Sequence, residues 1–175
     1  RVTLLQVSFA CLTLASVAIL ILIMTHSLNL SANILLAMAI LLLMAYAVPP
    51  LRISETGFGE LVLAVSLGSI IPAIAFLLQY DHLHRLLTFT TFPLTLLAMA
   101  YLLACNFPTF SNDQKLGHNS LLTRLTWQRA VSIHHFLVLA TYLLFVTSPF
   151  LEYPWGLVWP VFLAFPLAAW QVIWL

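Results

Sequence analysis

The chain has 175 residues, of which 63% are hydrophobic and 6% are charged, and its formal net charge is +1. An average soluble domain carries about 25% charged residues, so this composition excludes a water-soluble globular protein. Its six lysines and arginines are too few to form the basic surface that nucleic-acid binding requires. The composition therefore predicts an integral membrane protein with the lipid bilayer, and not nucleic acid, as its partner.

Apolar segments of membrane-spanning length divide the chain into six predicted helices. A transmembrane helix needs about 20 apolar residues, whereas barrel strands would alternate apolar and polar positions. Runs such as 34–44 show no alternation. We therefore expect an all-α, multi-spanning transmembrane bundle that forms one domain over residues 1–175. The predicted spans are 4–24, 34–48, 60–79, 86–104, 130–150 and 155–175, with Pro72 and Pro93 as expected kinks and Pro160 and Pro166 inside the last span.

Basic residues gather in segments that an even alternation of spans places on one side of the membrane. Only Arg85 falls on the other side. Because basic residues mark the cytoplasmic side, loops 49–60 and 105–129 are expected to face the cytoplasm from the inner (plasma) membrane of the cell. The basic residues on that side are Arg1, Arg52, Lys115, Arg124 and Arg129.

The loop 105–129 holds the densest group of ionisable side chains in the sequence. Asp113 is an oxygen donor of the kind that Mg2+ prefers, and one or two carboxylates suffice where substrate phosphates complete the coordination shell. Lys115, His118 and Arg124 are cations that could neutralise a diphosphate. The same residues also fit a solvated helix-capping loop, and the residue types alone favour neither interpretation.

The loop 49–60 adds Arg52, Glu55 and Glu60 to the same side. Glu60 opens a predicted helix, where a carboxylate is stabilised by the helix dipole, so its position alone favours a structural role. Tyr46 before the loop is by default an interfacial aromatic residue.

Two histidines and two glutamines fall inside or beside predicted spans. His134 and His135 are adjacent, so they point in different directions on a helix and cannot chelate one metal from one face. A haem ligand is possible, but hydrogen-bonded histidines fit better, since no second suitably placed intramembrane histidine is evident. Gln79 and Gln171 could form interhelical hydrogen bonds.

Two sequence patterns in these loops are specific. Residues 46–54 (YAVPPLRIS) and 57–60 (GFGE) combine an aromatic residue, Pro-Pro, Arg and Gly-x-Gly-Glu entering a helix. Residues 106–125 (NFPTFSNDQKLGHNSLLTRL) look like an aspartate-rich motif. Both patterns, in this order, resemble the UbiA superfamily of intramembrane aromatic prenyltransferases. They are most similar to the branch that includes the dihydroxynaphthoate prenyltransferases of menaquinone synthesis.

The resemblance implies a nine-helix fold of which this chain supplies about six helices. Two helices and the first aspartate-rich motif are then expected before Arg1, and one helix after Leu175. The implied activity is transfer of a polyprenyl group from its diphosphate to an aromatic acceptor, with Mg2+ as cofactor. The implied site consists of Asp113 as metal ligand, of Asp113, Lys115 and Arg124 as catalytic residues, and of Tyr46, Arg52, Glu60, Asn106, Thr109 and His118 as substrate-binding residues.

Four positions depart from the family pattern, among them Cys105, where an asparagine is common, and Thr56, where a basic residue is usual. Thr109 stands where the motif has its first aspartate, and His118 stands where a lysine is usual. Both support an alternative, a catalytically degenerate relative that binds isoprenoid lipids or a partner without catalysis. A transporter would need ionisable residues at mid-span depth, whereas every Asp, Glu, Lys and Arg lies at or near a span end. The oligomeric state stays open.

Overall fold

The computed structural model describes residues 29–80, 82 and 84–174, together with residues 6, 13, 14, 16, 17 and 19–21. The first predicted span, 4–24, therefore lies largely outside the described residues. Within the described part the chain is helical and has no strand, so the predicted all-α fold is confirmed.

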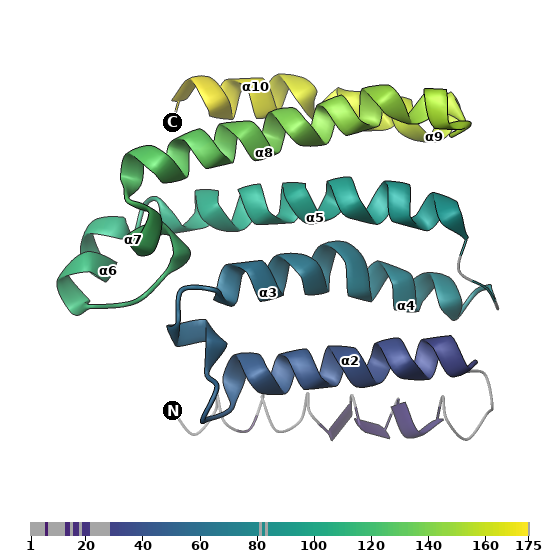
Figure 1. The fold of residues 1–175 in the computed structure, drawn as a ribbon, viewed down its shortest axis with the longest axis horizontal. Helices are drawn as coiled ribbons and strands as arrows, with labels where there is room; N and C mark the ends of the chain where they lie inside the picture. Colours follow the sequence, from purple (N-terminus) through teal and green to yellow (C-terminus); the bar gives the residue numbers. More distant parts are fainter. Residues whose placement is uncertain are drawn as a thin grey trace.

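Among the described residues, four helical rods are long and apolar enough to cross a membrane, which confirms an integral membrane protein. They lie side by side in chain order, and each runs antiparallel to the one before it (Figure 1). The rods are α2 (Leu30–Ala47); α3 (Gly59–Val65) with η2 (Ser66–Ile70) and α4 (Ile71–Leu77); α5 (Arg85–Asn106); and α8 (Trp127–Thr147), continued by the 3-10 turn η3 (Ser148–Leu151).

Helix α2 begins at Leu30, earlier than the predicted residue 34. The reason is a cap that the apolar pattern did not reveal: the Asn29 side chain accepts a hydrogen bond from the Ala32 N–H at 2.8 Å. An Asn at this position satisfies a backbone donor that the first helical turn leaves without an intrahelical partner.

The second rod contains a π-helical turn, η2, in its middle. Proline has no N–H, and its ring clashes with the carbonyl four residues earlier. For Pro72 that residue is Gly68, which lies in η2. The expected disturbance from Pro72 thus takes the form of a widened turn that precedes the proline.

Gly68 also sets how closely the second rod approaches α5. A Cβ atom on Gly68 would lie 2.4 Å from the Thr95 Cα atom, a distance that real side chains do not adopt. Beside this contact the Ser69 and Thr95 hydroxyls are hydrogen-bonded at 2.7 Å. A small residue is therefore required where the two helices touch, as is common for packed helices in membranes.

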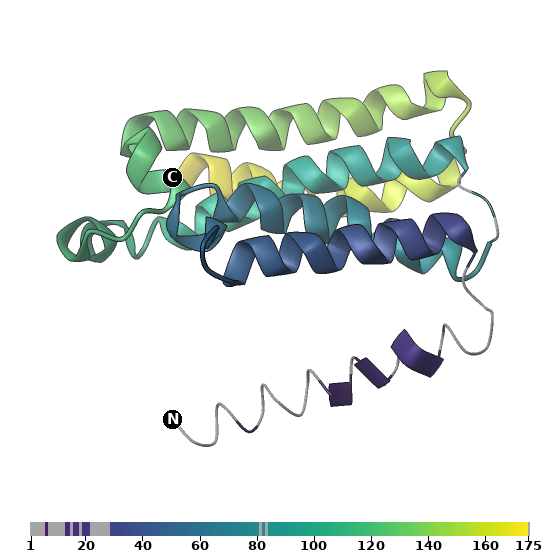
Figure 2. The ribbon, with the colours of Figure 1, turned by 60° about the horizontal axis from the view of Figure 1, so that its bottom comes forward.

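The last predicted span is broken into α9 (Trp155–Val158), the 3-10 segment η4 (Trp159–Ala164) and α10 (Phe165–Trp174). Pro160 and Pro166 each remove a backbone donor, which accounts for the interruption. Helix α10 packs against α8 around Tyr142 and Val138. Figure 2 shows this segment folding back along α8.

Helix α5 is the centre of the bundle, because it packs on α3 and η2 on one side and on α8 on the other. Its buried side chains include Leu103 and Ala100. At the end of the bundle away from the polar loops, Arg85 pairs with Glu152 at 2.6 Å, and Thr90 bonds the Tyr153 hydroxyl at 2.7 Å.

Candidate active site

The two polar loops lie at the same end of the bundle, beyond the ends of α2, α3, α5 and α8 (Figure 1). The predicted loop 105–129 is not an open loop. It folds into two short helices, α6 (Phe110–Leu116) and α7 (Leu121–Leu125), on a small core of Phe107, Leu122 and Ala130. Thr126, at a φ of 69°, separates α7 from α8. Asp113, Lys115 and Arg124 are therefore carried by short helices, and His118 lies in the segment between them.

Between the two loops lies a pocket of about 190 Å³, which we call the polar pocket. It brings together side chains from α2, α3, α5, α6 and the segment before α7. Of the residues that the sequence predicts for the site, five line it: Tyr46, Glu60, Asn106, Asp113 and His118. Residues 46 and 118 are far apart in the chain, so this grouping is a product of the fold.

The Glu60 carboxylate lines the polar pocket and is hydrogen-bonded to two other segments of the chain. Its Oε1 atom accepts hydrogen bonds from the Asn106 Nδ2 at 2.8 Å and from the Leu121 backbone N–H at 3.1 Å. Glu60 lies in the first turn of α3, Asn106 ends α5, and Leu121 begins α7. One carboxylate oxygen thus connects three helix ends and satisfies a first-turn donor of α7.

The start of α7 was not recognised as a functional element from the sequence. Ser120 and Thr123 form a capping box there: the Ser120 hydroxyl accepts from the Thr123 N–H, and the Thr123 hydroxyl accepts from the Ser120 N–H at 2.9 Å. The sequence Ser-Leu-Leu-Thr is a variant of the usual capping-box pattern, and it could have been used to predict the start of α7. The box holds the Leu121 N–H toward Glu60.

Asp113 lies in the first turn of α6 and is half-buried. Its Oδ2 atom accepts a hydrogen bond from the Thr109 hydroxyl at 3.0 Å. Thr109, at the position where the sequence resemblance leads one to expect an aspartate, therefore contacts the Asp113 carboxylate. The two positions lie one helical turn apart, so an aspartate at 109 would face Asp113.

No group of three or more His, Cys, Asp or Glu side chains in the described part of the chain is placed to hold a metal ion. The donors around Asp113 therefore do not fit an all-protein metal cage. A single protein carboxylate would be enough for a Mg2+ ion whose other ligands were phosphate oxygens and water.

Arg124 joins the two loops from outside the polar pocket. Its guanidinium lies 4.9 Å from the centre of the Phe58 ring, a cation–π contact. Gly57, at a φ of +79°, lies directly against it: a Cβ there would be 2.7 Å from the Arg124 Cδ and Nε atoms. Gly57 and Phe58 of the GFGE pattern thus pack against the Arg124 side chain.

The remaining predicted cations are not in the polar pocket. Arg52 pairs with Glu55 at 3.2 Å, and both side chains are exposed. Lys115 is exposed on α6. Their roles toward a substrate stay predictions.

The apolar helical rods define an integral membrane protein, and a polar pocket lies between the two loops at one end of the bundle. The family model of the UbiA prenyltransferase family matches residues 1–175, and the chain belongs to that family. No significant match is found among curated proteins or among solved structures. Members of the UbiA family are membrane prenyltransferases that generally use Mg2+.

Proposed function

We propose that this chain carries part of the site of an enzyme that transfers a polyprenyl group from its diphosphate to an aromatic acceptor in quinone biosynthesis, of the menaquinone type. The observation that carries the proposal is the polar pocket, in which the two loop patterns meet through Tyr46, Glu60, Asn106, Asp113 and His118. The acceptor class rests on the resemblance of these patterns to the dihydroxynaphthoate branch.

In this proposal the diphosphate lies at the polar end of the bundle. Mg2+, when bound, would neutralise negative charge on the departing diphosphate. Asp113 is the protein ligand for that ion, and Arg124, Lys115 and His118 supply positive charge around the diphosphate, with Arg52 at the edge. Cations fixed where charge develops stabilise such a transition state without reorganising during the reaction. Arg124 is best suited, because Phe58 and Gly57 hold it in one place.

The acceptor side of the site would be formed by Tyr46 and Glu60, with Asn106 and Thr109 beside the diphosphate. Because the Glu60 Oε1 atom already accepts two hydrogen bonds, we assign Glu60 a positioning role as well. The prenyl tail would lie along the apolar helix faces, where water is excluded from the allylic cation.

We propose that the polar end faces the cytoplasm from the plasma membrane. Arg52, Lys115, Arg124 and Arg129 belong to the polar end of the bundle, whereas Arg85 is at the opposite end. This distribution is the one expected when the polar end is cytoplasmic.

The test uses the complete protein in membranes, with radiolabelled polyprenyl diphosphate and dihydroxynaphthoate, with and without Mg2+. We expect Mg2+-dependent product that falls by on the order of a hundredfold in Asp113→Asn, because an interaction with developing charge is lost. Glu55→Gln is the matched control, since Glu55 is exposed and lies outside the polar pocket.

Absence of product from this and other aromatic acceptors, in a folded protein that still binds the diphosphate, would overturn the enzymatic proposal. The alternative, a relative that binds isoprenoids without catalysis, would then account for the threonine at position 109.

A further inference from the structure

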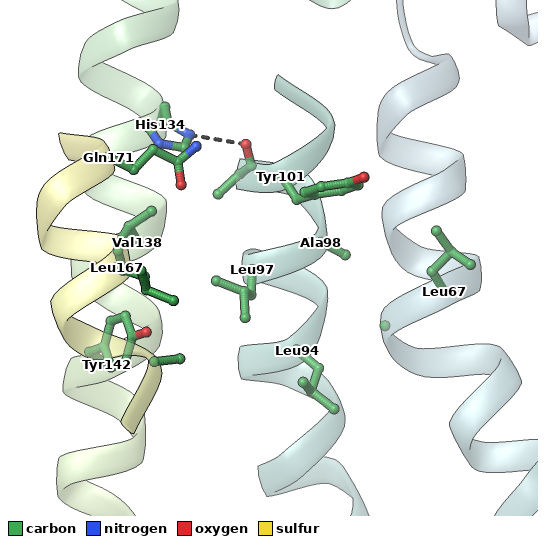
Figure 3. Close-up of a pocket in the computed structure, with 14 residues that line it drawn as sticks. Leu67, Leu94, Leu97, Ala98, Tyr101, His134, Val138, Tyr142, Leu167 and Gln171 are labelled. Atoms are coloured by element: carbon green, nitrogen blue, oxygen red, sulfur yellow. Dashed lines mark hydrogen bonds between the residues drawn. The ribbon is translucent and has the colours of Figure 1, made fainter. Parts of the chain in front are cut away.

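Helix α5 borders two cavities of opposite chemical character. A cavity of about 490 Å³ lies along its length, and Figure 3 shows Leu97 and Tyr101 of α5 among the side chains that line it. None of the described residues lining this cavity is an Asp, Glu, Lys or Arg. The polar pocket at the end of α5 holds two carboxylates, Glu60 and Asp113. Of the two cavities, only the polar pocket can therefore recognise a ligand through a carboxylate.

Asn106 is the last residue of α5, and the protein holds it by both its side chain and its backbone. Its Nδ2 atom donates to the Glu60 Oε1 atom at 2.8 Å. Its carbonyl oxygen accepts from the Thr109 N–H at 3.2 Å and from the Thr109 hydroxyl at 3.1 Å. Asn106 therefore presents a donor to Glu60 from a fixed position.

The two oxygens of the Glu60 carboxylate differ in what they can still bind. Oε1 accepts from Asn106 and from the Leu121 N–H, and these two bonds use its lone pairs. Oε2 has no hydrogen bond to any residue that the structure describes. It is not sealed inside the protein, because the unpaired and fully buried side-chain atoms of the described part belong to His134 and His135. Oε2 is therefore open to a molecule in the polar pocket, and as a carboxylate oxygen it can only accept.

This need for a donor narrows the group that can bind Oε2. In the proposed function the aromatic acceptor lies on the side of Glu60, and the diphosphate lies on the side of Asp113. An ionised diphosphate offers only acceptor oxygens, so Glu60 would repel it. A hydroxyl group on an aromatic ring donates one hydrogen, and hydrogen bonds to a charged acceptor are about twice as strong as neutral ones.

We propose that Asn106 is a positioning residue, which holds the Glu60 Oε1 atom so that Oε2 accepts a hydrogen bond from a hydroxyl group of the aromatic acceptor. The inference rests on the proposed prenyl transfer and deepens it, because it makes a ring hydroxyl a requirement for the acceptor. Asn106 then lies beside the diphosphate without being its ligand.

The first experiment is a double-mutant cycle on binding to the complete protein in lipid nanodiscs. Dissociation constants are measured without oxygen for dihydroxynaphthoate and, separately, for polyprenyl diphosphate with Mg2+. Asn106→Asp keeps the shape of the side chain but brings a negative charge against Glu60. We expect it to raise the dissociation constant of dihydroxynaphthoate about 10- to 100-fold, the effect of losing a hydrogen bond to a charged group.

The same substitution in a Glu60→Gln background should have a much smaller effect on acceptor binding, because no carboxylate remains to be repelled. Asn119→Asp is the matched control: Asn119 also lines the polar pocket, but in the described structure it has no hydrogen bond to Glu60. Its effect should be the same in both backgrounds. Equal effects of Asn106→Asp in the two backgrounds would overturn the positioning role. So would a loss of diphosphate binding greater than in Asn119→Asp while acceptor binding is intact.

Asn106→Leu repeats the cycle without adding charge, should Asn106→Asp fail to fold. Leucine has a similar branched shape but no donor, so the dissociation constant of dihydroxynaphthoate should rise about 3- to 10-fold, and by less in the Glu60→Gln background. An unchanged constant in Asn106→Leu would contradict the proposal.

A second comparison tests the hydroxyl group itself. In 1,4-dimethoxy-2-naphthoate both hydroxyls are replaced by ethers, so the wild type should bind this probe about 10-fold more weakly than dihydroxynaphthoate. In Glu60→Gln an amide nitrogen can take the place of Oε2 and donate to an ether oxygen, so the preference should be lost. A purely structural role of Glu60 would leave the preference unchanged, and a preference that survives Glu60→Gln would overturn the hydroxyl contact.

Failure of this inference can be told from failure of the proposed function. A wild type that binds the acceptor but forms no product fails as a prenyltransferase, while the binding cycle still tests Asn106. Product formation together with equal effects in the two backgrounds overturns the positioning role alone. A wild type that binds no aromatic acceptor overturns both.

Discussion

The Glu60 carboxylate accepts a hydrogen bond from the Asn106 side-chain amide across 2.8 Å, although 46 positions separate the two residues in the sequence. The same oxygen accepts from the Leu121 N–H, so the ends of α3, α5 and α7 are tied together at one atom. Both bonds join segments that line or adjoin the polar pocket.

Glu60→Ala should lower the free energy of unfolding by about 1.5–3 kcal/mol, because two donors lose a charged acceptor. Glu60→Gln should cost less, since its carbonyl oxygen can still accept both bonds. Thermal unfolding in detergent, followed by helical circular dichroism, measures the difference. Glu55→Ala serves as control and should be nearly neutral, because the Arg52–Glu55 pair is exposed. A Glu60→Ala protein as stable as the wild type would show that the bond does not hold the loop.

Thr109→Asp should strengthen Mg2+ binding, because it places a second carboxylate beside Asp113, whose Oδ2 atom now bonds the threonine hydroxyl at 3.0 Å. More charged oxygen ligands raise affinity for hard cations. We expect the Mg2+ concentration for half-maximal prenyl transfer to fall. Thr109→Asn, which adds no charge, should leave that concentration unchanged. If both variants respond alike, charge at position 109 is not what limits metal binding.

Gly68→Ala should destabilise the bundle, by about 1–3 kcal/mol, because the new methyl group would meet the Thr95 backbone at 2.4 Å. Gly156→Ala is the matched control, since nothing lies within 4 Å of a Cβ built there. Thermal unfolding of the two variants side by side isolates the close approach from the general effect of replacing a glycine. Equal melting temperatures would mean that the second rod can move away from α5 at no cost.

Gly57→Ala should lower prenyl transfer by displacing Arg124, whose side chain fills the space a Cβ would need. Gly117 has a similar positive φ, +68°, but no atom within 4 Å of its Cβ position. Gly117→Ala therefore carries the same backbone strain, about 1–2 kcal/mol, without touching the arginine. Comparing transfer rates at equal amounts of folded protein separates the two effects. An equal loss in both variants would point to strain alone.

The membrane class and most spans could be predicted from the sequence because long apolar runs have few alternatives in a bilayer. Helix α5 was predicted at 86–104 and observed at Arg85–Asn106. The boundaries were wrong where a polar cap decided them, as at Asn29. The helices α6 and α7 were missed because each is too short for a repeating pattern of apolar residues to be recognised.

The candidate site was predicted only as a set of residue types. That Asp113, Glu60 and Tyr46 share one pocket depends on how the two loops pack, which no local pattern contains. Likewise, Glu60 was weighed as a helix-start carboxylate, and its partners Asn106 and Leu121 lie too far along the chain to be read from spacing. The packing of Arg124 against Phe58 and Gly57 could not be predicted either, because these residues are also far apart in the sequence.

The widened turn at Ser66–Ile70 changes the rotational phase of the second rod. Each residue of an α-helix turns the chain by about 100°, so a π-helical turn, which accommodates an extra residue, rotates every later side chain relative to the earlier ones. In agreement, α3 packs mainly on α5, whereas α4 packs more on α2 than on α5. One span thereby presents different faces in its two halves. Removal of a single residue from this turn would restore a uniform phase and turn one half of the span away from its neighbour.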